Sequence, residues 1–243
     1  MPEVRPLRDV AEDFAAQLAD TVSRFLGREC NFTSTATPNG RFTVADDGGG
    51  IPLHIDGAPV LVLSVDIRCH WDSRETYLAV EQSFVKVFAG SQAGEPLFRY
   101  EFLRDPSNED IPCAHLQIGA HRDEFTHALG YGGATRRSKK RADIPPGKAP
   151  KIADVHFPLG GPRFRPCLED ILVMVREEFG IDTAAGWRDV VNEGRRRWRL
   201  IQLAAAVRDC PEEAARVLRD LDYVVERTTG SAASENVKRL VQA

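Results

Sequence analysis

The chain has 243 residues, of which 42% are hydrophobic, a composition typical of a folded protein with a sizeable core. This composition excludes a chain that is disordered throughout. The formal net charge of −4 argues against a general nucleic-acid coat protein. No run of about 18 apolar residues occurs and the first residues lack a signal-peptide pattern, so we expect no membrane segment and a cytoplasmic protein.

The five cysteines lie far apart and form no C-x-x-C pair, which predicts buried free thiols in place of a disulfide framework or a zinc knuckle. Four common motifs are absent from the sequence: H-E-x-x-H, G-x-S-x-G, G-x-x-x-x-G-K-[ST] and G-x-G-x-x-G. Their absence removes the commonest protease, hydrolase, nucleotide and dinucleotide signatures. We therefore expect no cofactor.

The N-terminal half predicts one helix followed by strands. Apolar residues recur at helical spacing from Leu7 to Leu26, and Gly27 stands where a left-handed helix terminus is common. Alternation over 31–44 around Pro38-Asn39-Gly40 predicts a β-hairpin. Later strands are predicted at 60–67, 77–88 and 97–103. Their short connections favour an antiparallel meander, because parallel pairing would need long crossovers.

The segment 112–170 contains the side chains best suited to chemistry. A strand at 113–121 alternates between two faces, with Ala114, Leu116 and Ile118 on one and His115, Gln117 and His121 on the other. A second strand at 153–158 places His156 on its polar face. If the two strands are neighbours, we expect His115 and His156 to share one solvent-open face.

The connection between these strands is strongly basic. Over 131–165 the sequence has nine cations and two anions, a local excess of seven positive charges. The predicted phosphate contacts within the loop 131–152 are Arg136, Arg137, Lys139, Lys140 and Arg141. The alternative is a solvated loop without regular structure. Arg163 and Arg165 precede a helix start and extend the predicted nucleic-acid contacts as an anion site.

The C-terminal third predicts helices only. One stripe runs from Leu168 to Phe179 and ends at Gly180, a second helix follows a cap at Asp182 or Thr183, and Pro211 starts a third. A short helix is expected at 235–241. Strands followed by helices predict an α+β fold with about six antiparallel strands, helices on one face and an all-helical C-terminal subdomain. We expect a core domain over 1–181 and a helical subdomain over 182–243. Eight apolar residues of the strands and of the helix after Pro166 are predicted to be buried together: Phe98, Tyr100, Phe102, Leu116, Ile118, Val155, Leu172 and Val175.

The histidines His115, His121 and His156 admit three interpretations. In metal-independent RNA cleavage, one imidazole removes the 2′-hydroxyl proton, a second protonates the leaving oxygen, and nearby cations stabilise the developing charge. Three imidazoles with a carboxylate could instead hold a transition metal, and a purely structural, hydrogen-bonded role is the third interpretation. We predict the first, with no metal site.

The order of elements over 77–179 resembles the TumE-like toxins of bacterial toxin–antitoxin pairs. The resemblance lies in Tyr100-Glu101-Phe102-Leu103-Arg104-Asp105-Pro106, the His115 strand and the helix start Leu168-Glu169-Asp170-Ile171-Leu172. It implies an RNA-directed toxin in which Arg104, Asp105 and His115 match the family motif, although the family has a dense histidine cluster at this strand. The alternative is a non-enzymatic nucleic-acid-binding or protein-binding module, adaptor-like or antitoxin-like, that holds a partner through its basic loop or C-terminal helices.

Overall fold

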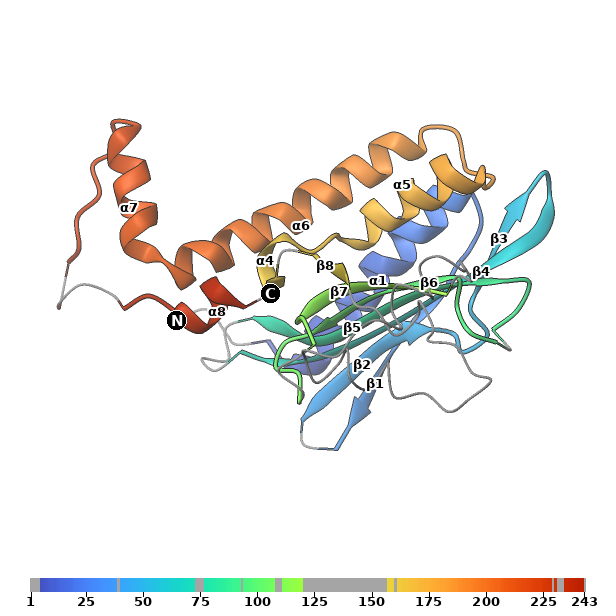
Figure 1. The fold of residues 1–243 in the computed structure, drawn as a ribbon, viewed down its shortest axis with the longest axis horizontal. Coiled ribbons are helices and arrows are strands. Elements are labelled where there is room, and N and C mark those ends of the chain that lie inside the picture. Colours follow the sequence, from blue (N-terminus) through green and yellow to red (C-terminus); the bar gives the residue numbers. More distant parts are fainter. Residues whose placement is uncertain are drawn as a thin grey trace, which may run out of the picture.

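The computed structural model describes residues 5–38, 40–72, 77–92, 94–107, 111–119, 157–159, 161–228, 230 and 234–242. Its centre is a sheet of eight strands in which every pairing is antiparallel (Figure 1). The order is β1-β2-β4-β5-β6-β7-β8, and β3 pairs with β4. The strands are β1 (Phe32–Thr37), β2 (Arg41–Asp46), β3 (Ile51–Ile55), β4 (Ala58–Trp71), β5 (Leu78–Ala89), β6 (Phe98–Leu103), β7 (Ala114–Ile118) and β8 (Phe157–Pro158).

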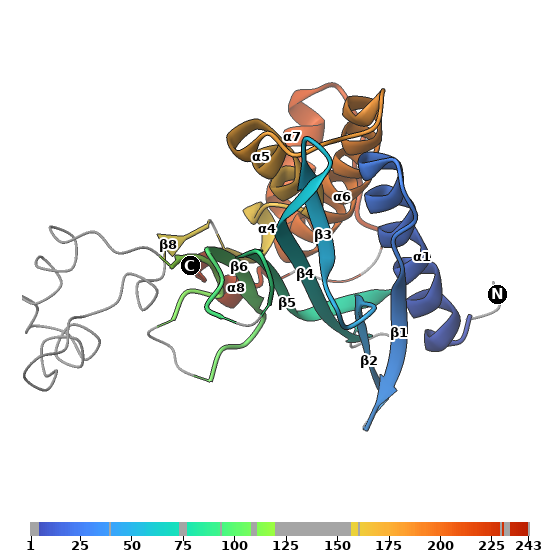
Figure 2. The same cartoon turned by 90° about the vertical axis from the view of Figure 1, so that its right-hand side faces the viewer.

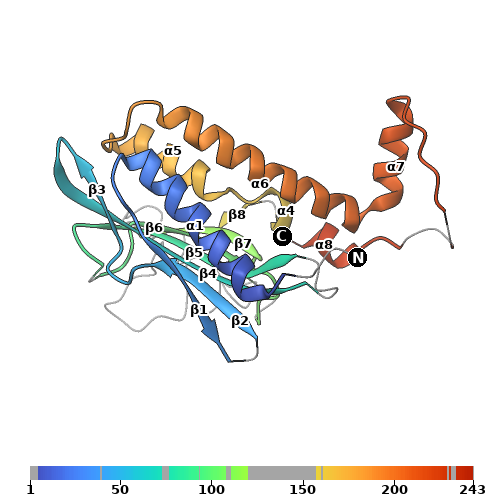
Figure 3. The same cartoon turned by 180° about the vertical axis from the view of Figure 1, so that it is seen from behind.

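Three helices cover one face of this sheet, as Figures 1 and 3 show from opposite sides: α1 (Leu7–Leu26), α5 (Leu168–Phe179) and α6 (Trp187–Asp209). The short α4 (Gly161–Phe164) precedes α5, and α7 (Pro211–Asp220) and α8 (Val237–Val241) follow α6. The predicted α+β fold, with helices on one face and further helices at the C-terminus, is confirmed, although the sheet has more strands than expected. Among the described helices, none is long and apolar enough to cross a membrane.

The helix α1 matches its predicted bounds. Its buried side is formed by residues at helical spacing, Ala11, Ala15, Leu18, Thr21, Val22 and Phe25. Gly27 ends the helix with φ 71°, a left-handed conformation that is costly for residues with a Cβ atom, and its N–H donates to the Ser23 carbonyl. Figure 2 shows α1 lying along the sheet beside β1.

The strand β3 was not predicted. It follows a glycine-rich turn and contains Pro52, two features that weaken a strand pattern in sequence. The buried carboxylate of Asp46 organises this region, because it accepts hydrogen bonds from the Gly50 N–H at 3.0 Å and the Val65 N–H at 2.7 Å. An acceptor that bridges β4 and the turn before β3 fixes where β3 begins.

The start of α6 was predicted wrongly. Neither Asp182 nor Thr183 caps this helix, which begins at Trp187 after Gly186. The Asp182 carboxylate instead accepts hydrogen bonds from the N–H groups of Asp56 and Gly57, at 3.2 and 2.8 Å, in the turn between β3 and β4. The Asp182 carboxylate, which the sequence pattern predicted as a helix cap, thus makes a tertiary contact with this turn.

The main core lies between the sheet and the three covering helices. Of the residues predicted to be buried together, Phe98, Leu172 and Val175 belong to this core, with Tyr100, Leu116 and Ile118 partly buried against it. Phe102 was placed wrongly, since it belongs to a second cluster with Cys113 and Ala114. Val155 lies outside the described residues.

The first half of α6 is part of the same core. Trp187 and Val191 are buried in it, and the ring of Trp187 meets Phe25 of α1 edge to face, with centroids 5.6 Å apart. In the second half of the helix, most apolar side chains are exposed. The helical C-terminal part of the chain is thus continuous with the core through α6 and leaves it near residue 200.

Candidate functional site

His115 lies on β7 opposite Glu101 of β6, as a cross-strand pair. Its side chain is 0% exposed. The ring Nδ1 lies 2.8 Å from the carbonyl oxygen of Pro112 and Nε2 lies 3.0 Å from Oε2 of Glu101. The two ring nitrogens are thus both engaged, one by a backbone oxygen and the other by a carboxylate oxygen. The expectation of a solvent-open face at His115 is therefore wrong, because β6 and the Pro112 turn enclose the ring.

The charge on Glu101 depends on this pairing. Burial alone would raise the pKa of Glu101, but the His115 hydrogen bond and the positive charges of Arg99, His115 and Lys86 together outweigh burial and lower it. The Glu101 Oε1 also lies 3.0 Å from Nε of Arg99. Glu101 thus joins β6 to β7 through His115 and also contacts Arg99 on its own strand.

Three carboxyls with lowered pKa values predict a loss of stability in acid. Besides Glu101, the pKa of Asp105 is lowered chiefly by the Lys238 hydrogen bond; for Asp170, burial is outweighed by hydrogen bonds from Arg195 and Cys167. A folded-state pKa below the unfolded value contributes stability that is present above the unfolded value and is lost as pH falls through the folded one. The urea concentration at the midpoint of unfolding should therefore stay constant from neutral pH to about pH 5 and should be lower at about pH 3. In the Glu101→Gln variant, the unfolding midpoint should depend less on pH in this acidic range. An unchanged dependence would contradict the role given to Glu101.

Arg104 and Asp105, which the toxin resemblance suggested as site residues, hold the C-terminal helix. The guanidinium of Arg104 donates twice to the Val80 carbonyl, from Nε at 3.0 Å and Nη2 at 2.7 Å. The carboxylate of Asp105 binds Lys238 at 2.5 Å and Arg239 at 3.2 Å. The contacts of Asp105, with hydrogen bonds from Arg239 and Gln242 to the Arg104 carbonyl, attach α8 to the turn after β6, whereas the Arg104 guanidinium ties this turn to β5. Both side chains are therefore engaged in structure.

Arg163 and Arg165, predicted as anion contacts, point into the protein. Nε of Arg163 donates to Oδ2 of the buried Asp209 at 2.6 Å, which ties α4 to the end of α6. Arg165 is 9% exposed, and its guanidinium carbon lies 3.7 Å from the ring centroid of Phe102 and 4.8 Å from that of Trp198. Burial lowers the pKa of Arg165, but a guanidinium starts so far above neutrality that it stays charged.

The remaining predicted site residues lie outside the described residues: His121, Arg136, Arg137, Lys139, Lys140, Arg141 and His156. The structure therefore does not test whether His115 and His156 are neighbours, and the catalytic and nucleic-acid-binding roles stay predictions. Within the described part of the chain, no group of three or more His, Cys, Asp or Glu side chains is arranged to hold a metal ion.

Among the described residues, most of the large hydrophobic side chains that are exposed lie on α6, on α7 and just after α7. The second half of α6 exposes Leu200, Ile201, Leu203 and Val207, and α7 with the residues after it exposes Val217, Leu218, Leu221, Tyr223 and Val224. No residue of α7 is buried. A ten-residue helix with an uncovered apolar face is marginal in water, because most helical stability in proteins comes from packing of that face. A covering partner would supply that packing.

The outer side of α6 combines apolar and basic side chains. Leu200, Leu203 and Val207 recur at helical spacing, on the side opposite the buried residues Gly194 and Ala205. A shallow surface hollow next to them is lined by Asn192, Arg195, Arg196, Arg199, Leu200 and Leu203. Arg195 pairs with Asp170 at 2.7 Å, whereas Arg196 and Arg199 are exposed and have no carboxylate within 4.0 Å in the part of the chain described here. We call Leu200, Leu203 and Val207 with Arg196 and Arg199 the α6 outer stripe.

The α7 helix rises from the end of α6 on the side away from the sheet (Figures 1 and 3). The sequence analysis predicted these helices but not their exposure. A signal was present in the sequence: the apolar positions 200, 203 and 207 fall on the opposite side of the helix from those at 187, 190 and 194, so one helix carries two apolar faces. A helix with two such faces needs two partners.

No family model matches the sequence, and neither the curated proteins nor the solved structures contain a significant match. The resemblance to TumE-like toxins stays a prediction.

Proposed function

We propose that the protein is a non-catalytic binding module that docks an acidic amphipathic helix of a partner protein on the α6 outer stripe. The observation that carries the proposal is a contiguous set of exposed leucine and valine side chains with exposed arginines beside them. Large exposed apolar patches rimmed by polar residues are typical of interaction sites. Burial of the apolar side chains of the stripe stabilises the complex, and Arg196 and Arg199 favour a partner with negatively charged side chains.

The aliphatic composition of the stripe favours a protein partner over RNA. RNA binding relies on phosphate contacts and on aromatic or arginine stacking with bases, whereas the exposed core of this stripe is aliphatic. The ribonuclease hypothesis draws no support from His115, whose ring nitrogens are engaged and whose side chain is enclosed. A binding function needs no solvent-open histidine.

The proposal is tested with two synthetic helical peptides that share leucines at i, i+3, i+4 and i+7. One carries glutamates beside the leucines and the other carries lysines. In fluorescence anisotropy titrations, we expect the glutamate peptide to bind and the lysine peptide to bind about tenfold more weakly or not at all. The double variant Arg196→Glu/Arg199→Glu should weaken binding of the glutamate peptide by about tenfold, because it removes two exposed attractions and adds two repulsions.

Two variants separate this proposal from its competitors. Leu203→Asp should weaken the binding of both peptides, because it places a charge in the apolar stripe. Arg8→Glu reverses an exposed charge on α1 and should change the binding of neither peptide. A structured RNA that binds, loses affinity in the Arg196→Glu/Arg199→Glu variant and ignores Leu203→Asp would assign the stripe to RNA. A dimer of the protein alone that Leu203→Asp dissociates would assign the stripe to a second copy. Either result would contradict the proposal.

A further inference from the structure

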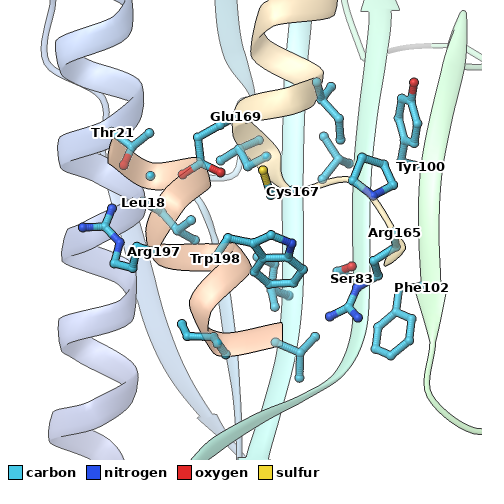
Figure 4. A pocket seen from close by; sticks show the side chains of 18 of the residues that line it. Leu18, Thr21, Ser83, Tyr100, Phe102, Arg165, Cys167, Glu169, Arg197 and Trp198 are labelled. Carbon is cyan, nitrogen blue, oxygen red and sulfur yellow. The ribbon is translucent and has the colours of Figure 1, made fainter. Parts of the chain in front are cut away.

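A cavity of about 130 Å³ lies between the sheet and the helices α1, α5 and α6, shown from close by in Figure 4. Its walls are largely apolar, with Leu18, Val85, Tyr100, Phe102, Ile171 and Trp198 among the lining residues. An apolar cavity of about 150 Å³ is large enough to hold benzene. At about 130 Å³ this cavity is slightly smaller, so a single aromatic ring is about the largest group that it can take.

The polar groups of the cavity stand on different elements. Arg165, on the segment between α4 and α5, lies beside Phe102, Ser83 and Trp198, whereas Glu169 points from α5 toward Thr21 of α1 (Figure 4). The aromatic contacts of Arg165 orient its guanidinium, which has five N–H donors and so accommodates more than one acceptor. Burial raises the pKa of the Cys167 thiol, so this side chain brings no negative charge to the cavity at neutral pH.

Glu169 of α5 lies at the contact between α5 and α6. It is 8% exposed, and a Cβ atom built at Gly194 of α6 would lie 2.0 Å from Glu169 Oε1. A larger residue at this position of α6 would therefore force the Glu169 side chain to move. Glu169 makes this part of the cavity unfavourable for a second anionic group.

The mouth of the cavity lies between α1 and α6. The exposed residues among its lining include Gln17 of α1 and Arg197 and Ile201 of α6. A cation at the entrance attracts anions through the local field. Arg197 at the mouth and Arg165 inside thus offset the negative charge of Glu169 and favour a ligand with one negatively charged group.

We infer that this cavity binds a small aromatic monocarboxylate, with the ring among the apolar walls and the carboxylate on the guanidinium of Arg165. Arginine holds a carboxylate through charge-assisted hydrogen bonds, often two in parallel. An aromatic ring suits the size of the cavity and the rings of Tyr100, Phe102 and Trp198 that line it. This site is separate from the α6 outer stripe, and the inference does not depend on the proposed partner.

The probe is benzoate, compared with its neutral analogue benzamide and with terephthalate, which has a second carboxylate. In isothermal titration and in melting experiments on the full chain, benzoate should bind saturably and raise the Tm. Benzamide should bind about 10- to 100-fold more weakly, because it lacks the charge that Arg165 recognises. Terephthalate should also bind more weakly, because it is larger and because Glu169 repels its second carboxylate.

Two variants locate the site. Ser83→Leu fills the cavity with a larger apolar side chain from β5, and it should abolish benzoate binding while the protein stays folded. Arg165→Met keeps much of the apolar stem and should remove the preference for benzoate over benzamide. Absence of benzoate binding to the wild-type protein would overturn the inference. So would equal binding of benzoate and benzamide, equal binding of benzoate and terephthalate, or a folded Ser83→Leu protein that binds benzoate normally.

Discussion

Replacing Leu172 by alanine should destabilise the protein by about 2–5 kcal/mol, because it opens a cavity in the main core. Leu172 lies on the sheet-facing side of α5 and is 0% exposed. For a chain of this size, each kcal/mol shifts the Tm by about 2–4 °C, so the melting temperature should fall by about 4–20 °C. Urea unfolding and thermal melting followed by circular dichroism measure both quantities.

The matched control is Leu203→Ala on the α6 outer stripe. Leu203 is 61% exposed, so the same chemical change should alter the free energy of unfolding by less than about 0.5 kcal/mol. An unchanged melting temperature for Leu172→Ala would refute the core described between α5 and the sheet. A large loss for Leu203→Ala would mean that the outer stripe is covered within the folded monomer.

Replacing His115 by alanine should cost about 2–4 kcal/mol, because the change removes a fully buried ring and leaves the Glu101 carboxylate without one partner. The Pro112 carbonyl loses its donor in the same step. We expect a fall in Tm of about 5–15 °C. A catalytic histidine would behave differently, since its loss would abolish activity and leave the melting temperature nearly unchanged.

His54→Ala is the matched control for this substitution. His54 lies on β3, is only partly buried, and has no side-chain hydrogen bond to another described residue. Its replacement should cost less than about 1 kcal/mol. If His115→Ala melts like the wild-type protein but loses an RNA-cleaving activity that persists in EDTA, the structural role assigned to His115 fails and the ribonuclease hypothesis gains its first support.

Much of the fold follows from local sequence patterns. The helix at Leu7–Leu26 and the helix at Leu168–Phe179 have clear apolar spacing and a terminal glycine, and the structure confirms both. Strand β3 and the start of α6 were missed because tertiary contacts decide them. Asp46 and Asp182 each offer carboxylate oxygens to backbone N–H groups that no short sequence window identifies.

The candidate site was harder to predict, because residue type indicates chemistry but not exposure. His115 and Arg165 were selected as reactive or anion-binding side chains, yet both are enclosed by neighbours from strands and helices distant in sequence. Strand alternation correctly separates His115 from Leu116, but it does not reveal that β7 is covered on the side of His115 as well. Conversely, the sequence places apolar residues on two sides of α6, but only the packing of α6 reveals that the side with Leu203 is the exposed one.

The most direct test of the proposed binding function is amide hydrogen exchange of the full chain with and without the glutamate-flanked peptide. Exchange reports the local opening of hydrogen-bonded backbone, which a docked helix suppresses. The account predicts that the peptide slows amide exchange in the second half of α6, around Leu200 to Val207. In the Leu203→Asp variant, adding the peptide should leave the exchange of this segment unchanged. Protection that appears elsewhere while α6 exchanges at its free rate, or saturable peptide binding that leaves exchange in α6 unaltered, would contradict it.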